Sequence, residues 1–206
     1  MRTALLLSVM VLLQAASGQD RSYFPAATKP GEDGVSKLEA KWFGTSLQRM
    51  NEPHLAPLAV EPDAEVYRIL ILPTWGNSIA VRVQKHGAIY RLTARRLSGH
   101  AGYDPGRLAE SRDVELTAAD SRTLDVLVQD LAFFQIATDD DVRGSDGDEW
   151  VLEGVSKGKY HVVDRWCATE YDPDKRKLRP FLALVKFLLD KSTLSQRPSD
   201  KGRRLM

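Results

Sequence analysis

The chain has 206 residues, 43% of them hydrophobic, with 29 Lys and Arg, 28 Asp and Glu, a formal net charge of +1 and one cysteine. This length fits one domain with tails, since a domain of about 130 residues can bury roughly two-thirds of its unfolded surface, and the balanced charge argues against nucleic-acid binding, which usually comes with a basic excess. The single cysteine excludes an intrachain disulfide and a cysteine-based metal site of the usual kind.

Residues 1–18 have the pattern of a secretory signal peptide. Arg2 supplies the positive start, and Ala4 to Leu13 form an apolar run of signal length that is too short to span a bilayer. Small residues at 16–18 predict cleavage before Gln19. An uncleaved amphipathic or buried helix is the alternative, but the run lacks a one-sided apolar stripe. We therefore expect a periplasmic or secreted protein with no transmembrane segment after signal removal.

Residues 19–63 are predicted to be a linker that contains one short helix. Ser36 stands three residues before Glu39, which is the spacing of a capping box, and the helix is expected over about residues 37–50. The sequence Asn51-Glu52-Pro53 ends it. Its aromatic side is expected to dock on the domain, with docking on a partner protein as the alternative.

A single domain is predicted over residues 64–191, and it begins with strands. Val66 to Leu72 is nearly all apolar, as in a central strand covered on both faces. The segments Ser78 to Gln84 and Ala88 to Leu97 alternate between apolar and polar residues, which favours two further strands. Asp113 to Leu116 is a candidate short edge strand.

Two helices are predicted in the C-terminal half. Thr117 caps the first, expected over residues 118–135, whose apolar stripe consists of Leu124, Leu127, Leu131 and Phe134. Pro180 suits the first turn of the second helix, which is expected to end near Lys191. The remaining residues, 192–206, are predicted to be a disordered basic tail.

Between these helices, residues 149–166 form two apolar runs separated by Ser156-Lys157-Gly158, which predicts a hairpin. A three-residue loop pairs Val155 with Lys159 and places Glu153 opposite His161. This register predicts that Arg165 points outward and that one face packs on the two C-terminal helices. The predicted buried face consists of Trp150, Leu152, Tyr160, Val162 and Trp166.

The order of elements predicts an α+β fold. It consists of an antiparallel β-sheet of about five to six strands with the two C-terminal-half helices packed on one face, plus the short N-terminal helix.

Three segments resemble a group of uncharacterised bacterial exported proteins. They are WVLEGVSKGKYHVVDRW at 150–166, WFGTSLQRMNEP at 42–53, and the helix end Leu131-Ala132-Phe133-Phe134. The resemblance covers about residues 40–190. It implies strands followed by a capped helix, a hairpin and a last helix, and it implies an envelope location, but no activity.

The acidic stretch from 139 to 149 is a candidate cation site, because calcium prefers several oxygen ligands from one flexible loop. An EF-hand frame that starts at Asp139 fails, since Arg143 stands at position five and Trp150 at position twelve. A solvated acidic loop is the favoured interpretation, and no metal or other cofactor is assigned. The candidate ligands would be Asp139, Asp141, Asp146 and Asp148.

Glu153 and His161 are the candidate catalytic residues, because the predicted register would let them form an acid–base pair. Cys167 could complete a thiol mechanism, but it lies six residues beyond His161, roughly 20 Å along an extended strand. A cross-strand polar pair and an incidental thiol explain the pattern more simply. No catalytic residue is therefore assigned.

Four strand arginines, Arg82, Arg91, Arg95 and Arg96, could form a cationic strip that attracts an anionic polymer or lipid headgroups. Solvent-facing basic residues are the simpler explanation. The expected function is a non-enzymatic, exported, soluble domain that acts by binding in the bacterial envelope, with an envelope protein or an anionic polymer as partner. The alternative is a hydrolase of unknown substrate that uses the acidic loop 139–149 or the Glu153/His161 pair.

Overall fold

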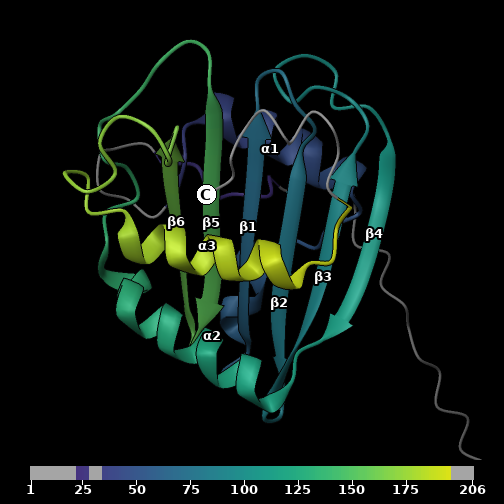
Figure 1. The fold of residues 1–206 in the computed structure, drawn as a ribbon, viewed down its shortest axis with the longest axis vertical. Coiled ribbons are helices and arrows are strands. Elements are labelled where there is room, and N and C mark those ends of the chain that lie inside the picture. Colours follow the sequence, from purple (N-terminus) through teal and green to yellow (C-terminus); the bar gives the residue numbers. More distant parts are fainter. Residues whose placement is uncertain (1–21, 28–33, 196–206) are drawn as a thin grey trace, which may run out of the picture.

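Within residues 22–27 and 34–195, which a computed structural model describes, six strands form one antiparallel sheet in the order β4-β3-β2-β1-β5-β6 (Figure 1). The predicted signal peptide at 1–18 and the tail from residue 196 onward lie outside the described residues. The α+β fold is as predicted. The strands are β1 (Glu65–Pro73), β2 (Ile79–His86), β3 (Ile89–Leu97), β4 (Leu108–Glu115), β5 (Asp148–Ser156) and β6 (Lys159–Trp166).

Strand β1 lies at the centre of the sheet, paired with β2 on one side and β5 on the other. Every residue of β1 after Glu65 is buried, which confirms the central strand covered on both faces. Strand β4 is longer than the predicted segment that began at Asp113. Its exposed charged residues hide the strand pattern, and such residues are common on edge strands because they oppose pairing with other chains.

Two helices cover one face of the sheet, α2 (Ala118–Leu131) and α3 (Arg179–Lys191) (Figure 1). Thr117 caps α2 by accepting a hydrogen bond from the backbone of Asp120. The helix stops short of the predicted residue 135, because Ala132 adopts a left-handed conformation with φ 50°. A 3-10 helix, η2 (Phe133–Gln135), follows, and it sends Phe133 into the core.

The N-terminal helix α1 (Lys37–Arg49) packs on the opposite face of the sheet (Figure 1). Both hydrogen bonds of the predicted capping box are present, between Ser36 and Glu39. Phe43 and Leu47 are fully buried against the sheet, so the aromatic side of α1 docks on its own chain. In the described part of the chain, no helix is both long and apolar enough to cross a bilayer.

Much of the segment predicted as a linker packs on the sheet. Phe24 is buried edge-on against Phe43, with ring centroids 5.9 Å apart. A second 3-10 helix, η1 (Ala56–Val60), follows Leu55, which is also buried. At the other end, Ser195 hydrogen-bonds to Glu110 of β4. The packed unit therefore extends beyond the predicted limits of 64 and 191 on both sides.

The predicted hairpin register is wrong by one residue. The turn between β5 and β6 has two residues, Lys157 and Gly158, with φ of 51° and 74°. Both are left-handed, as a type I′ turn requires, so Ser156 pairs with Lys159. Because side chains alternate along a strand, a one-residue shift moves every β6 side chain to the other face.

This shift reverses the predicted positions on β6. Arg165, expected to point outward, is 5% exposed, and its guanidinium donates to the backbone carbonyls of Ala137 and Thr138. Trp166, expected against α2, instead stacks on Tyr171 with ring centroids 4.9 Å apart. Tyr160 and Val162 likewise lie on the α1 face of the sheet rather than on the α2 face.

Candidate functional site

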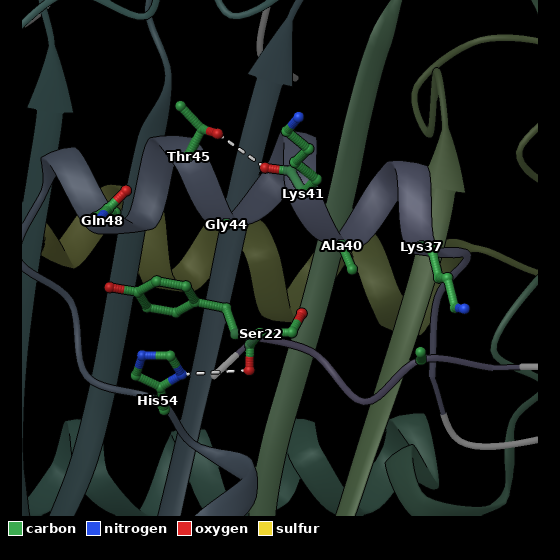
Figure 2. Close-up of a pocket in the computed structure, with 10 residues that line it drawn as sticks. Ser22, Lys37, Ala40, Lys41, Gly44, Thr45, Gln48 and His54 are labelled. Atoms are coloured by element: carbon green, nitrogen blue, oxygen red, sulfur yellow. Dashed lines mark hydrogen bonds between the residues drawn. The ribbon is translucent and has the colours of Figure 1, made fainter. Parts of the chain in front are cut away.

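An open groove of about 690 Å³ runs between α1 and the N-terminal segment 22–26 (Figure 2). One side is formed by α1 residues that repeat at helical spacing, and the other by the extended segment and His54. The apolar part of the lining consists of small residues, Ala26, Ala40 and Gly44. The remaining lining residues are polar or aromatic: Ser22, Tyr23, Lys37, Lys41, Thr45, Gln48 and His54.

Two lysines of α1 give the groove its charge. Lys37 and Lys41 lie one turn apart and are exposed. Among the described residues, neither ammonium group has a carboxylate within ion-pair distance. In Figure 2, Lys37 extends toward the N-terminal segment and Lys41 toward the outer side of the helix. The lysine stems are flexible, so both amines can reach a ligand in the groove.

A stacked pair of rings closes one end of the groove. Tyr23 and His54 lie with ring centroids 4.0 Å apart and an interplanar angle of 13°. The Tyr23 hydroxyl donates to the backbone carbonyl of Glu52, and its ring packs on Gly44, where an added Cβ would lie 3.3 Å from Tyr23 Cδ2. These contacts fix the N-terminal segment against α1 and leave the groove open beside it.

Beneath the Tyr23 ring lies a buried ionic network centred on Arg68 of β1. The Arg68 guanidinium is fully buried, 5.9 Å from the ring centroid, and it donates to Glu153 of β5 and to Glu52. Burial alone would lower the pKa of Arg68, but the Glu153 and Glu52 carboxylates raise it, so the group stays protonated.

Glu52 reaches the sheet because Asn51, two residues after the end of α1, has a left-handed backbone with φ 54° and turns the chain there. Its carboxylate also accepts hydrogen bonds from Arg82 at 2.9 Å and Arg95 at 3.2 Å. With Arg68 and Glu153, the network contains three arginines and two glutamates. It therefore carries a net charge of +1 next to the groove.

The predicted strip of four arginines is divided between two faces of the sheet. Arg82 and Arg95 share the carboxylate of Glu52 on the α1 face. Arg91 is exposed and lies 3.6 Å from a carboxylate oxygen of Glu115. Arg96 is buried and donates to the backbone carbonyl of Ser195, which follows α3.

The structure does not bring the candidate catalytic residues together. Glu153 pairs with Val162, and its carboxylate accepts hydrogen bonds from Arg68 and Tyr160 on the α1 face. His161 lies on the other face, where its Nε2 is 2.9 Å from the carbonyl oxygen of Ile136. The predicted pairing of Glu153 with His161 rested on the three-residue loop and is lost with it.

Two aspartates of the acidic loop form ion pairs with arginines. Arg143 pairs with Asp139, and the side chains of Arg165 and Arg176 both approach Asp140. Among residues 22–27 and 34–195, no three His, Cys, Asp or Glu side chains gather closely enough to hold a metal ion. The four candidate ligands Asp139, Asp141, Asp146 and Asp148 thus form no such group.

The carboxyl groups of Glu149 and Asp164 lie next to each other where the acidic loop enters β5. Asp164 is 2% exposed, and its nearest charged partner in the described chain is Arg143, at 3.5 Å. Burial and the nearby Asp164 carboxyl raise the pKa of Glu149 to about 9, and burial raises the pKa of Asp164 to about 6. At neutral pH the pair holds a proton, and this property is common in acid–base sites.

Arg176 shapes the loop that follows β6. Its guanidinium donates to the carbonyls of Trp166, Cys167 and Glu170, and to the Asp140 carboxylate at 2.8 Å. The Cys167 thiol is buried beneath this loop, and burial raises its pKa. A raised pKa disfavours the nucleophilic thiolate, so the environment suits an inert thiol.

Sequence reasoning assigned no site role to Lys37, Lys41 or Tyr23, because the groove forms only when the N-terminal segment packs beside α1. The position of Arg68 in the sequence could have indicated the buried ionic network. A charged side chain inside an otherwise apolar central strand must find a buried partner. Comparison of the chain with models of known protein families, with curated protein sequences and with solved structures found no match.

Proposed function

We propose that this chain is a non-enzymatic domain, exported to the bacterial envelope, that binds an anionic polymer in the groove beside α1. The single observation that carries the proposal is the pair of exposed lysines, Lys37 and Lys41, which line the groove and have no carboxylate within ion-pair distance among the described residues. Export rests on the sequence pattern of residues 1–18 and on the stated resemblance.

The surroundings of the groove favour a negative ligand. The buried network below Tyr23 has one more arginine than glutamates, so its field adds to that of the two lysines. The Gln48 amide and the Ser22 hydroxyl can donate hydrogen bonds to carboxylate or phosphate oxygens, whereas the Thr45 hydroxyl already donates to the carbonyl of Lys41. The groove is open to solvent between α1 and the N-terminal segment, so part of a chain-like ligand can lie in it.

Fluorescence anisotropy with a labelled oligoglutamate tests this function. The double variant Lys37→Gln/Lys41→Gln should weaken binding at least tenfold. The matched control is Lys157→Gln/Lys159→Gln, which removes two exposed lysines from the distant β5–β6 turn and should change binding less than twofold. The affinity of the unmodified chain should fall as salt is raised. Equal losses in the two double variants would refute the groove as the site.

The hydrolase alternative keeps one supporting observation, the Glu149–Asp164 carboxyl pair beside the acidic loop. One group holding a proton while its neighbour is ionised could act as acid and base. Access to the pair is limited, since Asp164 is almost fully buried. If hydrolysis of an envelope polymer were detected and abolished by Glu149→Gln but not by Glu115→Gln, the hydrolase would displace the binding function.

A further inference from the structure

The long loops of the molecule gather at one end of the sheet, and every exposed Trp or Tyr side chain among the described residues lies in them. The loops are 74–78, 98–107, 137–147 and 167–178, at the end where β1, β3 and β6 finish (Figure 1). The opposite end has the two-residue turn at Lys157 and Gly158. The exposed aromatic residues are Trp75, Tyr103 and Tyr171, at 58%, 65% and 59%.

The loops that carry these side chains contact one another in one row. Trp75 lies 5.0 Å from Tyr103 between ring centroids, and the backbone of Gly102 donates to the carbonyl of Thr74. Thr74 in turn donates its backbone N–H and its hydroxyl to the carbonyl of Gly147. The loop with Trp75 is therefore held directly beside the start of β5.

The row continues from Gly147 across to β6. A Cβ added at Gly147 would lie 2.8 Å from Trp166 Nε1, and one at Gly144 would overlap the Trp166 ring, so both glycines permit close packing on the indole. Tyr171 stacks on Trp166. The row from Trp75 to Tyr171 crosses two strand spacings, on the order of 10 Å, which about three residues of extended chain can span.

The loop conformation holds Tyr171 outward. Tyr171 and Asp172 both have left-handed backbones, with φ of 55° and 58°. Such conformations are sparsely populated for these residue types and persist only where the surroundings enforce them. Here the hydrogen bonds from Arg176 to the carbonyls of residues 166, 167 and 170 supply that constraint.

The charge around the row is negative. Including Asp148 and leaving out Glu149, which stays protonated at neutral pH, the four loops contain five acidic residues in 137–148, three in 167–178 and one in 98–107. They contain five Lys and Arg in all, whereas the whole chain has a net charge of +1. Several of these acids are exposed and have no ion-pair partner among the described residues. They are Asp141, Asp146, Glu170 and Asp172.

We propose that this loop end is a second binding surface, distinct from the groove, and that its ligand is an extended lysine- or arginine-rich segment of a partner protein. Aromatic faces attract cations, and the attraction is stronger for arginine because its planar guanidinium also stacks on the ring. The unpaired carboxylates would bind the same side chains and speed their encounter. Trp, Tyr and charged pairs at the centre of a contact commonly carry most of its binding energy.

The test uses the mature full-length chain and two labelled decapeptides, one in which arginine alternates with glycine and one in which serine replaces arginine. Anisotropy should show at least tenfold tighter binding of the arginine peptide at low salt. Trp75→Ala, a change at an exposed side chain, should weaken it at least fivefold. Val126→Ala, which trims an exposed apolar side chain on α2, should leave it within twofold.

A second pair of variants tests the contribution of the acidic side chains separately from that of the aromatic ones. Glu170→Gln/Asp172→Asn should weaken binding at least fivefold and flatten its salt dependence. Its matched control, Glu61→Gln/Asp63→Asn, removes the same charges at the same spacing from the segment before β1, and should have little effect. Equal affinity for the two peptides overturns the proposal. So does a loss on Trp75→Ala with no response to either charge variant, which would indicate a neutral ligand such as an oligosaccharide.

Discussion

Arg68 and Glu153 form a fully buried ion pair between the neighbouring strands β1 and β5, with Arg68 Nη2 2.6 Å from Glu153 Oε1. The two residues face each other directly in the β1–β5 ladder. Tyr160 donates to the second carboxylate oxygen of Glu153, and Glu52 approaches Arg68 from the other side. Glu153 is thus a structural partner of Arg68, which explains why a polar pair lies in the middle of an apolar sheet.

Removing Arg68 should be strongly destabilising. Arg68→Met would leave the carboxylates of Glu52 and Glu153 buried with less compensation, and breaking a buried ion pair typically costs about 3–5 kcal/mol. Urea denaturation should show a loss of that order. Arg91→Met is the matched control, because Arg91 is largely exposed and should cost under about 1 kcal/mol. Similar losses for the two variants would show that the network contributes little.

The Glu149 carboxyl should make stability depend on pH. Burial and Asp164 raise its pKa to about 9, above the unfolded value of about 4.3. The folded state therefore keeps its proton longer than the unfolded state, and stability is greatest below the unfolded pKa and is lost as pH rises toward 9. Glu149→Gln should flatten the unfolding free energy between pH 5 and 9. A Glu149→Gln profile parallel to that of the unmodified chain would contradict this assignment.

The corrected register predicts that truncating either of the last two residues of β6, Arg165 or Trp166, lowers the stability of the fold. Trp166→Ala should cost about 3–5 kcal/mol, as for other buried indoles. Arg165→Ala should cost about 1–3 kcal/mol, because the carbonyls of Ala137 and Thr138 would lose buried donors. The three-residue loop instead predicts a cost under about 1 kcal/mol for Arg165→Ala, so denaturant melts of this variant distinguish the two registers.

Arg176 should control access to the only thiol of the chain. Arg176→Ala would release the carbonyls of Trp166, Cys167 and Glu170 and loosen the loop over Cys167. The reaction of Cys167 with a disulfide reagent should then be at least tenfold faster. Lys175→Ala, at an exposed neighbour, should leave the rate unchanged. If Cys167 reacted equally fast in all three proteins, the loop would not depend on Arg176.

Most of the fold could be predicted because each element carries its own periodicity. The Ser36 and Thr117 caps and the apolar run of β1 are local signals, and the structure contains all of them. The hairpin register was predicted wrongly, since Ser156, Lys157 and Gly158 are compatible with a loop of two or three residues. That difference of one residue decides which face every β6 side chain takes.

The candidate site was harder to predict, because it depends on tertiary packing. Phe24 stands among prolines, glycines and charges, where composition indicates a linker, yet it inserts beside Phe43 and brings Tyr23 against α1. The groove exists only through this contact. The same holds for Glu52, whose role depends on the left-handed Asn51 that turns it toward Arg68.

The most direct test of the binding function is an amide NMR titration of the mature chain with oligoglutamate. Binding in the groove should shift the amide signals of residues 22–26 and 37–48, and of His54, in a saturable manner. The signals of the distant turn at 157–159 should remain in place. Shifts confined to other basic surfaces, or no saturable shift in the α1 region, would contradict the proposal that the groove beside α1 is the ligand site.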